Sequence, residues 1–210
     1  MTKLYDLIVV GAGPAGLLAA KAAAENGLTV ALLERKKDPT KMTRACAQSL
    51  ISMNEYYMGN LCNFNARDRR ICFSSDGFSF GYSGPYRDAY NLEIRTPKDH
   101  PVEFGDYEVQ RSKGIGGRVG VIFDKEILFQ DLLGELESLS VDVISGVPVN
   151  NATAKADRVI VEGAGKSWEA AYVIAADGAN SAGTGAIGLN REREYYCNIH
   201  AISHYLSNVQ

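Results

Sequence analysis

The sequence is poor in the residues that build metal centres and disulfide scaffolds. Its 210 residues include only four cysteines and three histidines. The cysteines, Cys46, Cys62, Cys72 and Cys197, form no C-x-x-C pair. This spacing argues against a zinc cluster and against a disulfide-rich secreted domain. We therefore expect reduced thiols and no metal site.

The sequence also lacks a large excess of positive or negative charge, and it lacks long apolar runs. The formal net charge is −3, which gives no electrostatic basis for binding nucleic acid. No apolar stretch approaches the roughly 20 residues that a membrane-spanning helix needs. The opening segment MTKLYDLIVV lacks the apolar core and cleavage site of a secretory signal. These absences predict a cytoplasmic protein.

The most informative residues are the first forty. The apolar run Leu4–Val10 leads directly into GAGPAG at residues 11–16, and an alanine- and leucine-rich stretch follows up to Gly27. A second apolar run then ends in Glu34, roughly 20 residues after the glycines. Strand-length runs on either side of a helix-forming stretch predict a βαβ unit, and this spacing of glycines and acid is typical of a dinucleotide fingerprint.

Each residue type in this fingerprint has a physical task. The first glycine permits a tight turn, the second lets a pyrophosphate approach the backbone, and the third allows close packing of helix on strand. The helix start presents unpaired N–H groups to phosphate, and the acid accepts hydrogen bonds from ribose hydroxyls. That acid also disfavours a 2′-phosphate. The predicted cofactor-binding residues of this unit are Gly11, Gly13, Pro14, Ala15, Gly16, Glu34 and Arg35.

A second motif, VIAADGANS, occupies Val173–Ser181. An apolar run closed by Asp-Gly predicts a buried strand that stops at a turn. Together, DLIVVGAGPAGLLAA with ALLER and this segment resemble FAD-dependent oxidoreductases of the p-hydroxybenzoate hydroxylase and geranylgeranyl reductase superfamily. The resemblance implies that Asp177 and Gly178 lie close to the FAD pyrophosphate. From the residues alone, Asp177 either orients backbone N–H groups there or caps the turn.

The resemblance implies an α/β fold: a Rossmann-like FAD-binding domain with a parallel sheet and an inserted antiparallel β region. We predict the FAD-binding domain at residues 1–60 and 112–190 and the insertion at 61–111. Residues 191–210 then begin a substrate-domain sheet. The family's later Gly-Asp motif is not found after Ser181. We therefore expect an N-terminal half that lacks the C-terminal substrate domain, as a truncated, interrupted or split protein.

The middle of the chain resembles the superfamily less closely. Residues 38–57 are predicted as a loop and then a helix, in which Arg44 is a candidate phosphate ligand. The RAC segment resembles the geranylgeranyl reductases, which implies that Cys46 lies near the isoalloxazine ring as the catalytic residue, with Ala47 beside the cofactor. The family continues into glycines where this chain has Ala47 and Gln48. A buried, inert Cys46 is the alternative.

Two further segments carry predictions. Phe78, Phe80, Tyr82 and Tyr86 alternate in the insertion, as the lining of a pocket or as the buried face of a sheet. Residues 118–149 are predicted as strand, helix and strand, and residues 157–178 as a hairpin into the last sheet strand. The strand–helix segment resembles an Arg-x-x-Phe-Asp motif whose arginine contacts FAD. Gly120 stands at that position, so Arg118 is the nearest candidate.

The resulting hypothesis is an FAD-dependent oxidoreductase that reduces C=C bonds of a prenyl or other apolar substrate. An aromatic monooxygenase and an FAD-binding half without activity of its own are the alternatives. The expected partners are a small apolar or aromatic substrate and an external electron donor, either NAD(P)H or a ferredoxin-like protein. We also expect peripheral membrane contact and either a homodimer or a separately encoded C-terminal half.

Overall fold

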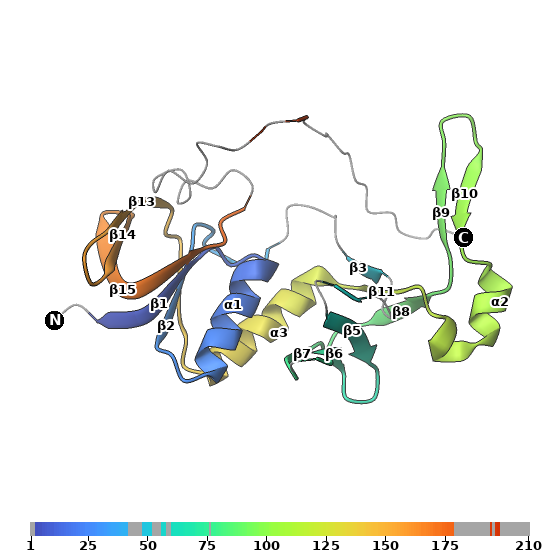
Figure 1. The fold of residues 1–210 in the computed structure, drawn as a ribbon, viewed down its shortest axis with the longest axis horizontal. Helices are drawn as coiled ribbons and strands as arrows, with labels where there is room; N and C mark the ends of the chain where they lie inside the picture. Colours follow the sequence, from blue (N-terminus) through green and yellow to red (C-terminus); the bar gives the residue numbers. More distant parts are fainter. Residues whose placement is uncertain are drawn as a thin grey trace. The chain divides into compact units, whose positions relative to one another are not determined.

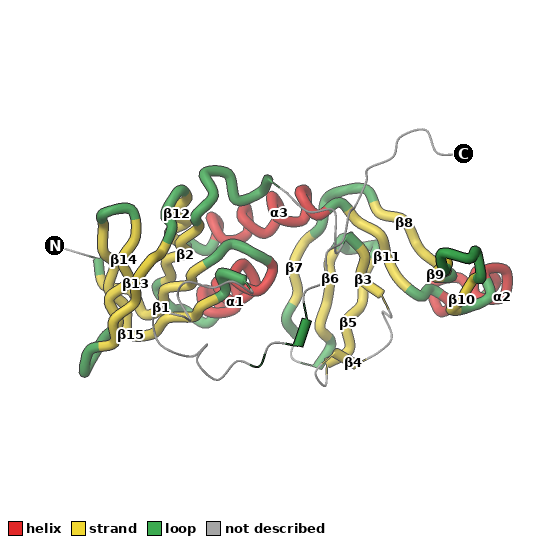
Figure 2. The backbone as a smooth tube through the Cα atoms, turned by 90° about the horizontal axis from the view of Figure 1, so that it is seen from above, coloured by secondary structure: helices red, strands yellow, loops and turns green. Residues whose placement is uncertain are grey.

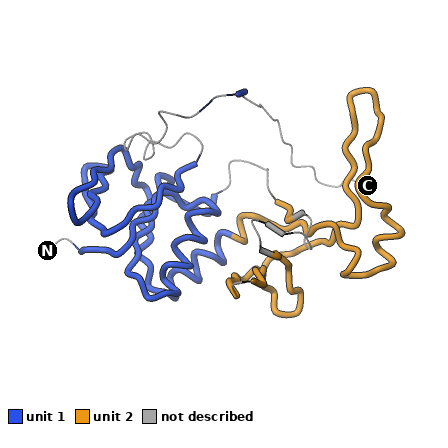
Figure 3. Tube along the Cα trace, viewed as in Figure 1, with its two compact units in different colours: residues 1–41, 129–202 blue, residues 42–128, 203–210 orange. Residues whose placement is uncertain are grey.

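The computed structural model describes residues 3–41, 48–51, 56–57, 60–75, 77–178, 194, 196 and 197. The chain divides into two compact units, residues 1–41 with 129–202 and residues 42–128 with 203–210 (Figure 3).

The first unit is built on a six-stranded sheet with strand order β12-β2-β1-β15-β14-β13 (Figure 1 and Figure 2, the second of which labels all six strands). β12, β2, β1 and β15 are parallel, and β13 and β14 continue the sheet as antiparallel strands. The helices of this unit are α1 (Pro14–Glu25) and most of α3 (Lys125–Ser138). The first residues of α3, up to Leu128, belong to the second unit. The strands are β1 (Leu4–Val10), β2 (Val30–Glu34), β12 (Asp142–Ser145), β13 (Val149–Ala154), β14 (Val159–Gly163) and β15 (Lys166–Ala175).

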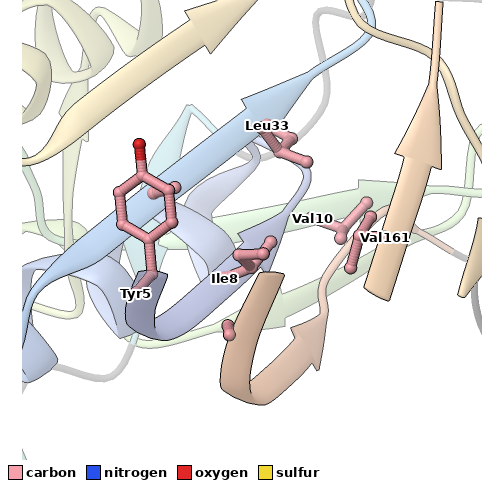
Figure 4. Packing of buried hydrophobic residues seen from close by; sticks show 7 residues of the cluster. Tyr5, Ile8, Val10, Leu33 and Val161 are labelled. Carbon is pink, nitrogen blue, oxygen red and sulfur yellow. The ribbon is translucent and has the colours of Figure 1, made fainter. Parts of the chain in front are cut away.

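β1 and β2 read as apolar runs because both of their faces are covered. Every residue of β2 is buried, and Ile8 and Val9 of β1 have no exposed surface. The predicted burial of the strand before Asp177 was wrong, because Tyr172 and Ile174 of β15 are 74% and 41% exposed. A buried cluster draws on β1, β2, β14 and β15, namely Tyr5, Ile8, Val10, Ala31, Leu33, Val161 and Ala170 (Figure 4). An ion pair of 3.3 Å between Lys21 and Glu135 joins α1 to α3. The predicted βαβ unit and the predicted hairpin are both confirmed.

The second unit contains antiparallel strands in three small sheets, with orders β4-β5-β6-β7, β3-β11-β8 and β10-β9 (Figure 2). The strands are β3 (Ser49–Ile51), β4 (Tyr56–Tyr57), β5 (Asn60–Asn65), β6 (Arg70–Phe73), β7 (Ser79–Gly81), β8 (Tyr86–Ala89), β9 (Leu92–Arg95), β10 (Pro101–Phe104) and β11 (Gly120–Phe123). A short helix α2 (Tyr107–Ser112) and a 3-10 turn η1 (Gly114–Gly117) precede β11.

These strands confirm the α/β class with an antiparallel β region. Antiparallel pairing also reaches beyond residues 61–111, because β11 pairs with both β3 and β8. The assignment of these segments to domains stays a prediction. The strand, helix and strand expected over residues 118–149 are present as β11, α3 and β12.

A second expectation was also wrong. A helix was predicted in the segment that ends at residue 57, yet Ser49–Ile51 is the strand β3. Leu50 pairs with Val121 and Ser49 with Ile122 of β11. A three-residue run carries too little periodicity to specify a helix, and pairing with a partner distant in sequence decides its conformation.

The alternating aromatic residues of the second unit pack on one another. Phe80 and Tyr82 are buried, the rings of Phe73, Phe78 and Phe80 are in contact, and Phe64 meets Tyr82 edge-on. This packing supports the buried-sheet interpretation rather than a pocket lining.

In the part of the chain that the structure describes, we find no helix long and apolar enough to cross a membrane.

Candidate nucleotide-binding site

The turn after β1 is shaped by close contact with the end of β15. Gly11 has φ +102°, a conformation that favours glycine. A Cβ atom at Gly11 would lie 2.5 Å from the carbonyl oxygen of Ala176. The N–H of Ala176 donates a 2.8 Å hydrogen bond to the carbonyl of Val10. The two sequence motifs, far apart in the chain, therefore meet at this turn.

The start of α1 is open to an anion. Gly13 is the N-cap residue, Pro14 and Ala15 follow it, no side chain caps the helix, and its first turn contains no acidic residue. A Cβ atom at Gly13 would have nothing within 4 Å, whereas one at Gly16 would lie 1.8 Å from the carbonyl oxygen of Gly11. Gly13 thus leaves the backbone approachable, and Gly16 lets α1 pack on the turn. Uncapped N–H groups at the positive end of the helix dipole favour phosphate.

The carboxylate of Glu34 is fixed in place at the end of β2. The side chain is 7% exposed. Oε2 accepts a 2.7 Å hydrogen bond from the backbone N–H of Ala12, and Oε1 accepts one of 2.8 Å from that of Lys36. A carboxylate has about four acceptor positions, so two donors orient the group and leave capacity for hydroxyls of a ligand.

A pocket of about 210 Å³ opens beside these groups. It lies at the carboxyl ends of parallel strands, where ligands of open α/β sheets bind. Its volume is smaller than the roughly 300–1,000 Å³ of a pocket for a whole drug-sized ligand, which suits one part of a dinucleotide. The lining residues are Val10, Gly11, Leu33, Glu34, Arg35, Val147, Pro148, Val149 and Asp177.

Asp177 and Gly178 reach this pocket through strand pairing. β15 runs parallel to β1 with Ala175 opposite Val10, so both strands end at the same edge. Gly178 has φ +93° and supplies the turn. Asp177 lines the pocket beside Gly11. The cofactor roles of both residues stay predictions.

The wall formed by Val147, Pro148 and Val149 was missed by sequence reasoning. The N–H of Val147 donates a 2.8 Å hydrogen bond to the carbonyl of Glu34, and the N–H of Gly146 donates one of 2.8 Å to that of Lys36. Since β12 is parallel to β2, the segment that follows β12 must emerge at the ligand edge. The strand predicted before SGVPV was the one signal that could have identified it.

Four further residues were predicted for the site, namely Arg44, Cys46, Ala47 and Arg118. Arg44, Cys46 and Ala47 lie outside the described residues. Arg118 belongs to the second unit and is 7% exposed. Its Nη1 pairs with Asp88 at 2.9 Å, and its Nη2 donates to the carbonyl of Phe64 at 3.1 Å. Its contact with FAD stays a prediction. Among the described residues, no group of His, Cys, Asp and Glu side chains could hold a metal ion.

The site fits the adenosine and pyrophosphate part of FAD. The open helix start suits a pyrophosphate, and the oriented carboxylate of Glu34 suits ribose hydroxyls. The apolar wall at residues 147–149 suits the flat face of adenine.

Comparison with known proteins agrees with this geometry. A digeranylgeranylglycerophospholipid reductase of Methanosarcina acetivorans is 28% identical over 186 residues, which cover 86% of this chain and 39% of the relative. The Methanocaldococcus jannaschii protein of the same name is 38% identical over 123 residues, 58% of this chain and 29% of the relative. The chain thus spans about 39% of the length of the first of these relatives.

Solved structures share the fold. A geranylgeranyl bacteriochlorophyll reductase-like protein of Thermoplasma acidophilum matches with a TM-score of 0.61 at 19% identity, over 89% of this chain and 42% of that one. The p-nitrophenol 4-monooxygenase of Pseudomonas putida matches with a TM-score of 0.62 at 20% identity, over 90% of this chain and 44% of that one.

The family model for pyridine nucleotide-disulphide oxidoreductases matches residues 5–204. This match and the reductase relatives confirm the superfamily resemblance and FAD as the cofactor. The chain belongs to the pyridine nucleotide-disulphide oxidoreductase family of FAD-binding domains.

Proposed function

We propose that this chain is the FAD-binding part of an oxidoreductase that reduces C=C bonds in the prenyl chains of a lipid. The observation that carries the proposal is its similarity to digeranylgeranylglycerophospholipid reductases over 86% of its length. Because the chain spans about 39% of those relatives, the activity is proposed for the protein of which this domain forms the cofactor-binding part.

The residues of the first unit bind and orient the cofactor in this proposal. The N-terminus of α1, from Gly13 to Gly16, receives the pyrophosphate. Glu34 accepts hydrogen bonds from the ribose hydroxyls, and the buried position of its carboxylate excludes competing water. Arg35 lines the same pocket, where it contacts the adenosine. FAD, when bound, supplies the redox chemistry, and the protein supplies position and electrostatics.

Three residues outside the described ranges complete the proposal. Arg44 contacts phosphate, Ala47 lies beside the cofactor, and Cys46 lies against the flavin ring as the catalytic residue. Their support is the resemblance of the RAC segment to the geranylgeranyl reductases. Asp177 and Gly178 lie near the pyrophosphate, which their place at the Gly11 turn supports.

The partners follow from the same reaction class. Reduction of a double bond needs two electrons, which we assign to NAD(P)H or a ferredoxin-like donor. A prenyl lipid as substrate brings the protein into peripheral contact with a membrane. We propose that the remaining flavin-holding groups come from a C-terminal half, encoded separately or downstream, or from a second copy in a homodimer.

Aromatic hydroxylation is the second candidate, because p-nitrophenol 4-monooxygenase shares the fold with a TM-score of 0.62. The two candidates separate in one experiment. The protein is loaded with FAD, reduced with dithionite under nitrogen and incubated with an unsaturated prenyl lipid, and the masses of the products are measured by mass spectrometry. Gain of two hydrogens per double bond supports reduction. A second sample, reduced in the same way, is mixed with oxygen and a phenol, and hydroxylation of the phenol with no change in the lipid would favour the alternative.

A further inference from the structure

Gly163 is buried at the end of β14 and does not line the pocket. A Cβ atom at Gly163 would lie 2.6 Å from the carbonyl oxygen of Pro148 and 3.0 Å from Cγ1 of Val147. A Cβ contact as short as the first of these is essentially never seen in real structures, so a side chain at position 163 must displace backbone. The backbone that it would displace is the wall of the nucleotide pocket.

That wall is held from two sides. On one side, the N–H of Val147 is bonded to the carbonyl of Glu34 at the end of β2. On the other side, Val149 pairs with Gly163 in the β13–β14 ladder, and the ladder is irregular just after this pair. The wall therefore lies between Glu34, the proposed ribose ligand, and Gly163. Its backbone has no space to move toward Gly163.

We propose that Gly163 is a positioning residue for the adenosine part of FAD. It acts through Val147 and Pro148, which lie between Glu34 and β14. Their position leaves space for only a hydrogen atom at residue 163, where any other amino acid has a Cβ atom. This inference rests on the nucleotide site of the proposed function and is independent of which substrate is reduced.

Alanine at position 163 tests this contact specifically. The φ angle of Gly163 is outside the left-handed range, so alanine there adds steric contact without backbone strain. Gly134, in the middle of α3, offers the matched control, because a Cβ atom there would have nothing within 4 Å. Gly134→Ala also removes a helix-interior glycine, so it should fold at least as well as wild type.

The experiment measures the Kd of FAD and of ADP by calorimetry, alongside urea unfolding, for wild type, Gly163→Ala and Gly134→Ala. We expect Gly163→Ala to weaken both ligands at least tenfold while the protein remains folded, and Gly134→Ala to leave both affinities unchanged. Loss of FAD and ADP affinity by the same factor locates the defect at the shared adenosine part. A lower urea midpoint with unchanged ADP affinity would overturn the proposal, since it is the result of a merely structural role.

A second variant keeps the test decisive if Gly163→Ala does not fold. Val147→Ala removes both γ-methyl groups of Val147, including Cγ1, which lies nearest to Gly163. The wall is then less tightly packed, so ADP affinity should fall severalfold in a folded protein. Unchanged affinity in this variant would contradict the proposal. If wild type itself binds neither FAD nor ADP, the nucleotide site fails as a whole. If wild type binds and both variants bind equally well, only the role of Gly163 fails.

Discussion

The carboxylate of Glu34 accepts a 2.7 Å hydrogen bond from the backbone N–H of Ala12, which lies inside the glycine-rich turn. The acid that ends β2 is therefore tied to the loop for which we propose pyrophosphate binding. With Lys36 N–H on its other oxygen at 2.8 Å, the carboxylate is oriented before any ligand arrives. Orientation in advance lowers the entropic cost of binding.

Glu34→Ala should weaken FAD and ADP without unfolding the chain. Each lost hydrogen bond to a charged acceptor is worth roughly 1.5–3 kcal/mol, so we expect at least a tenfold rise in Kd by calorimetry. Glu34→Gln should also weaken binding, because its amide group brings a donor toward one of the two backbone N–H groups. Glu108→Ala, an exposed change on α2, serves as control. Equal affinity in wild type and Glu34→Ala would reject Glu34 as the ribose ligand.

Gly16→Ala and Gly13→Ala should fail in different ways. A Cβ atom at position 16 would lie 1.8 Å from the carbonyl oxygen of Gly11, so we expect Gly16→Ala to destabilise the fold by more than about 3 kcal/mol in urea unfolding, above the usual cost of overpacking. Gly13→Ala meets no neighbour and should fold normally. It should bind FAD at least tenfold more weakly, because the methyl group would occupy the place proposed for the pyrophosphate. Identical unfolding midpoints for the two variants would contradict this assignment.

Local sequence signals were enough to predict the βαβ unit. A buried parallel strand, a glycine turn and an alanine-rich helix each carry their own pattern, and Glu34 follows at a spacing that the fold fixes. The strand before Asp177 and the turn at Gly178, which has φ +93°, were also predicted from local signals. The burial of this strand was not, because Tyr172 and Ile174 are exposed.

The rest of the site depends on pairing between distant segments. The wall at Val147–Val149 exists because β12 pairs with β2, and nothing local in SGVPV indicates a ligand. β3 is a strand because β11 lies beside it. The two backbone donors that orient Glu34 were likewise outside the reach of sequence reasoning, because they depend on exact strand ends.

Cys62 should be the least reactive thiol among the described cysteines. It is 1% exposed, and burial raises its pKa to about 11, so little of the nucleophilic thiolate exists at pH 8. Cys197 is exposed and should react first with a maleimide, as followed by mass spectrometry of peptides. The proposed place of Cys46 near the flavin predicts that added FAD slows its labelling, while the labelling of Cys197 stays unchanged. Fast labelling of Cys62 in the folded chain would be inconsistent with the packing of β5.

Asp142 should contribute to stability at neutral pH and lose that contribution in acid. Hydrogen bonds from Lys3 and from the hydroxyl of Tyr5, the latter 2.7 Å long, lower the pKa of Asp142 below its usual value of 3.8. A lowered pKa in the folded state stabilises the protein above pH 4, and the effect is lost as the pH falls through the folded-state pKa. The side chain is 39% exposed, so solvent screening limits the contribution to about 1 kcal/mol. Asp142→Asn should therefore lower urea stability at pH 7, and by progressively less as the pH falls below 4. A loss that does not change over this pH range would reject the linkage.

Asp88 should be essential to the second unit because it is the acidic partner of a buried cation. Arg118 is 7% exposed, and its pair with Asp88 is 2.9 Å long. Removing one partner of a buried ion pair costs about 3–5 kcal/mol, whereas replacing both by apolar residues is often neutral. Asp88 is itself 27% exposed, so we expect the lower end of that range for Asp88→Ala.

The double variant Asp88→Ala with Arg118→Met should recover most of this loss, because no unpaired charge then remains buried. Urea unfolding of the two single variants and the double variant gives the coupling energy directly. If the double variant is as unstable as Asp88→Ala, the stability lost in Asp88→Ala does not come from leaving the Arg118 charge unpaired. Calorimetry with FAD on the same three proteins then tests the cofactor role predicted for Arg118. Weaker FAD binding in the stable double variant is expected only if the guanidinium contacts the cofactor.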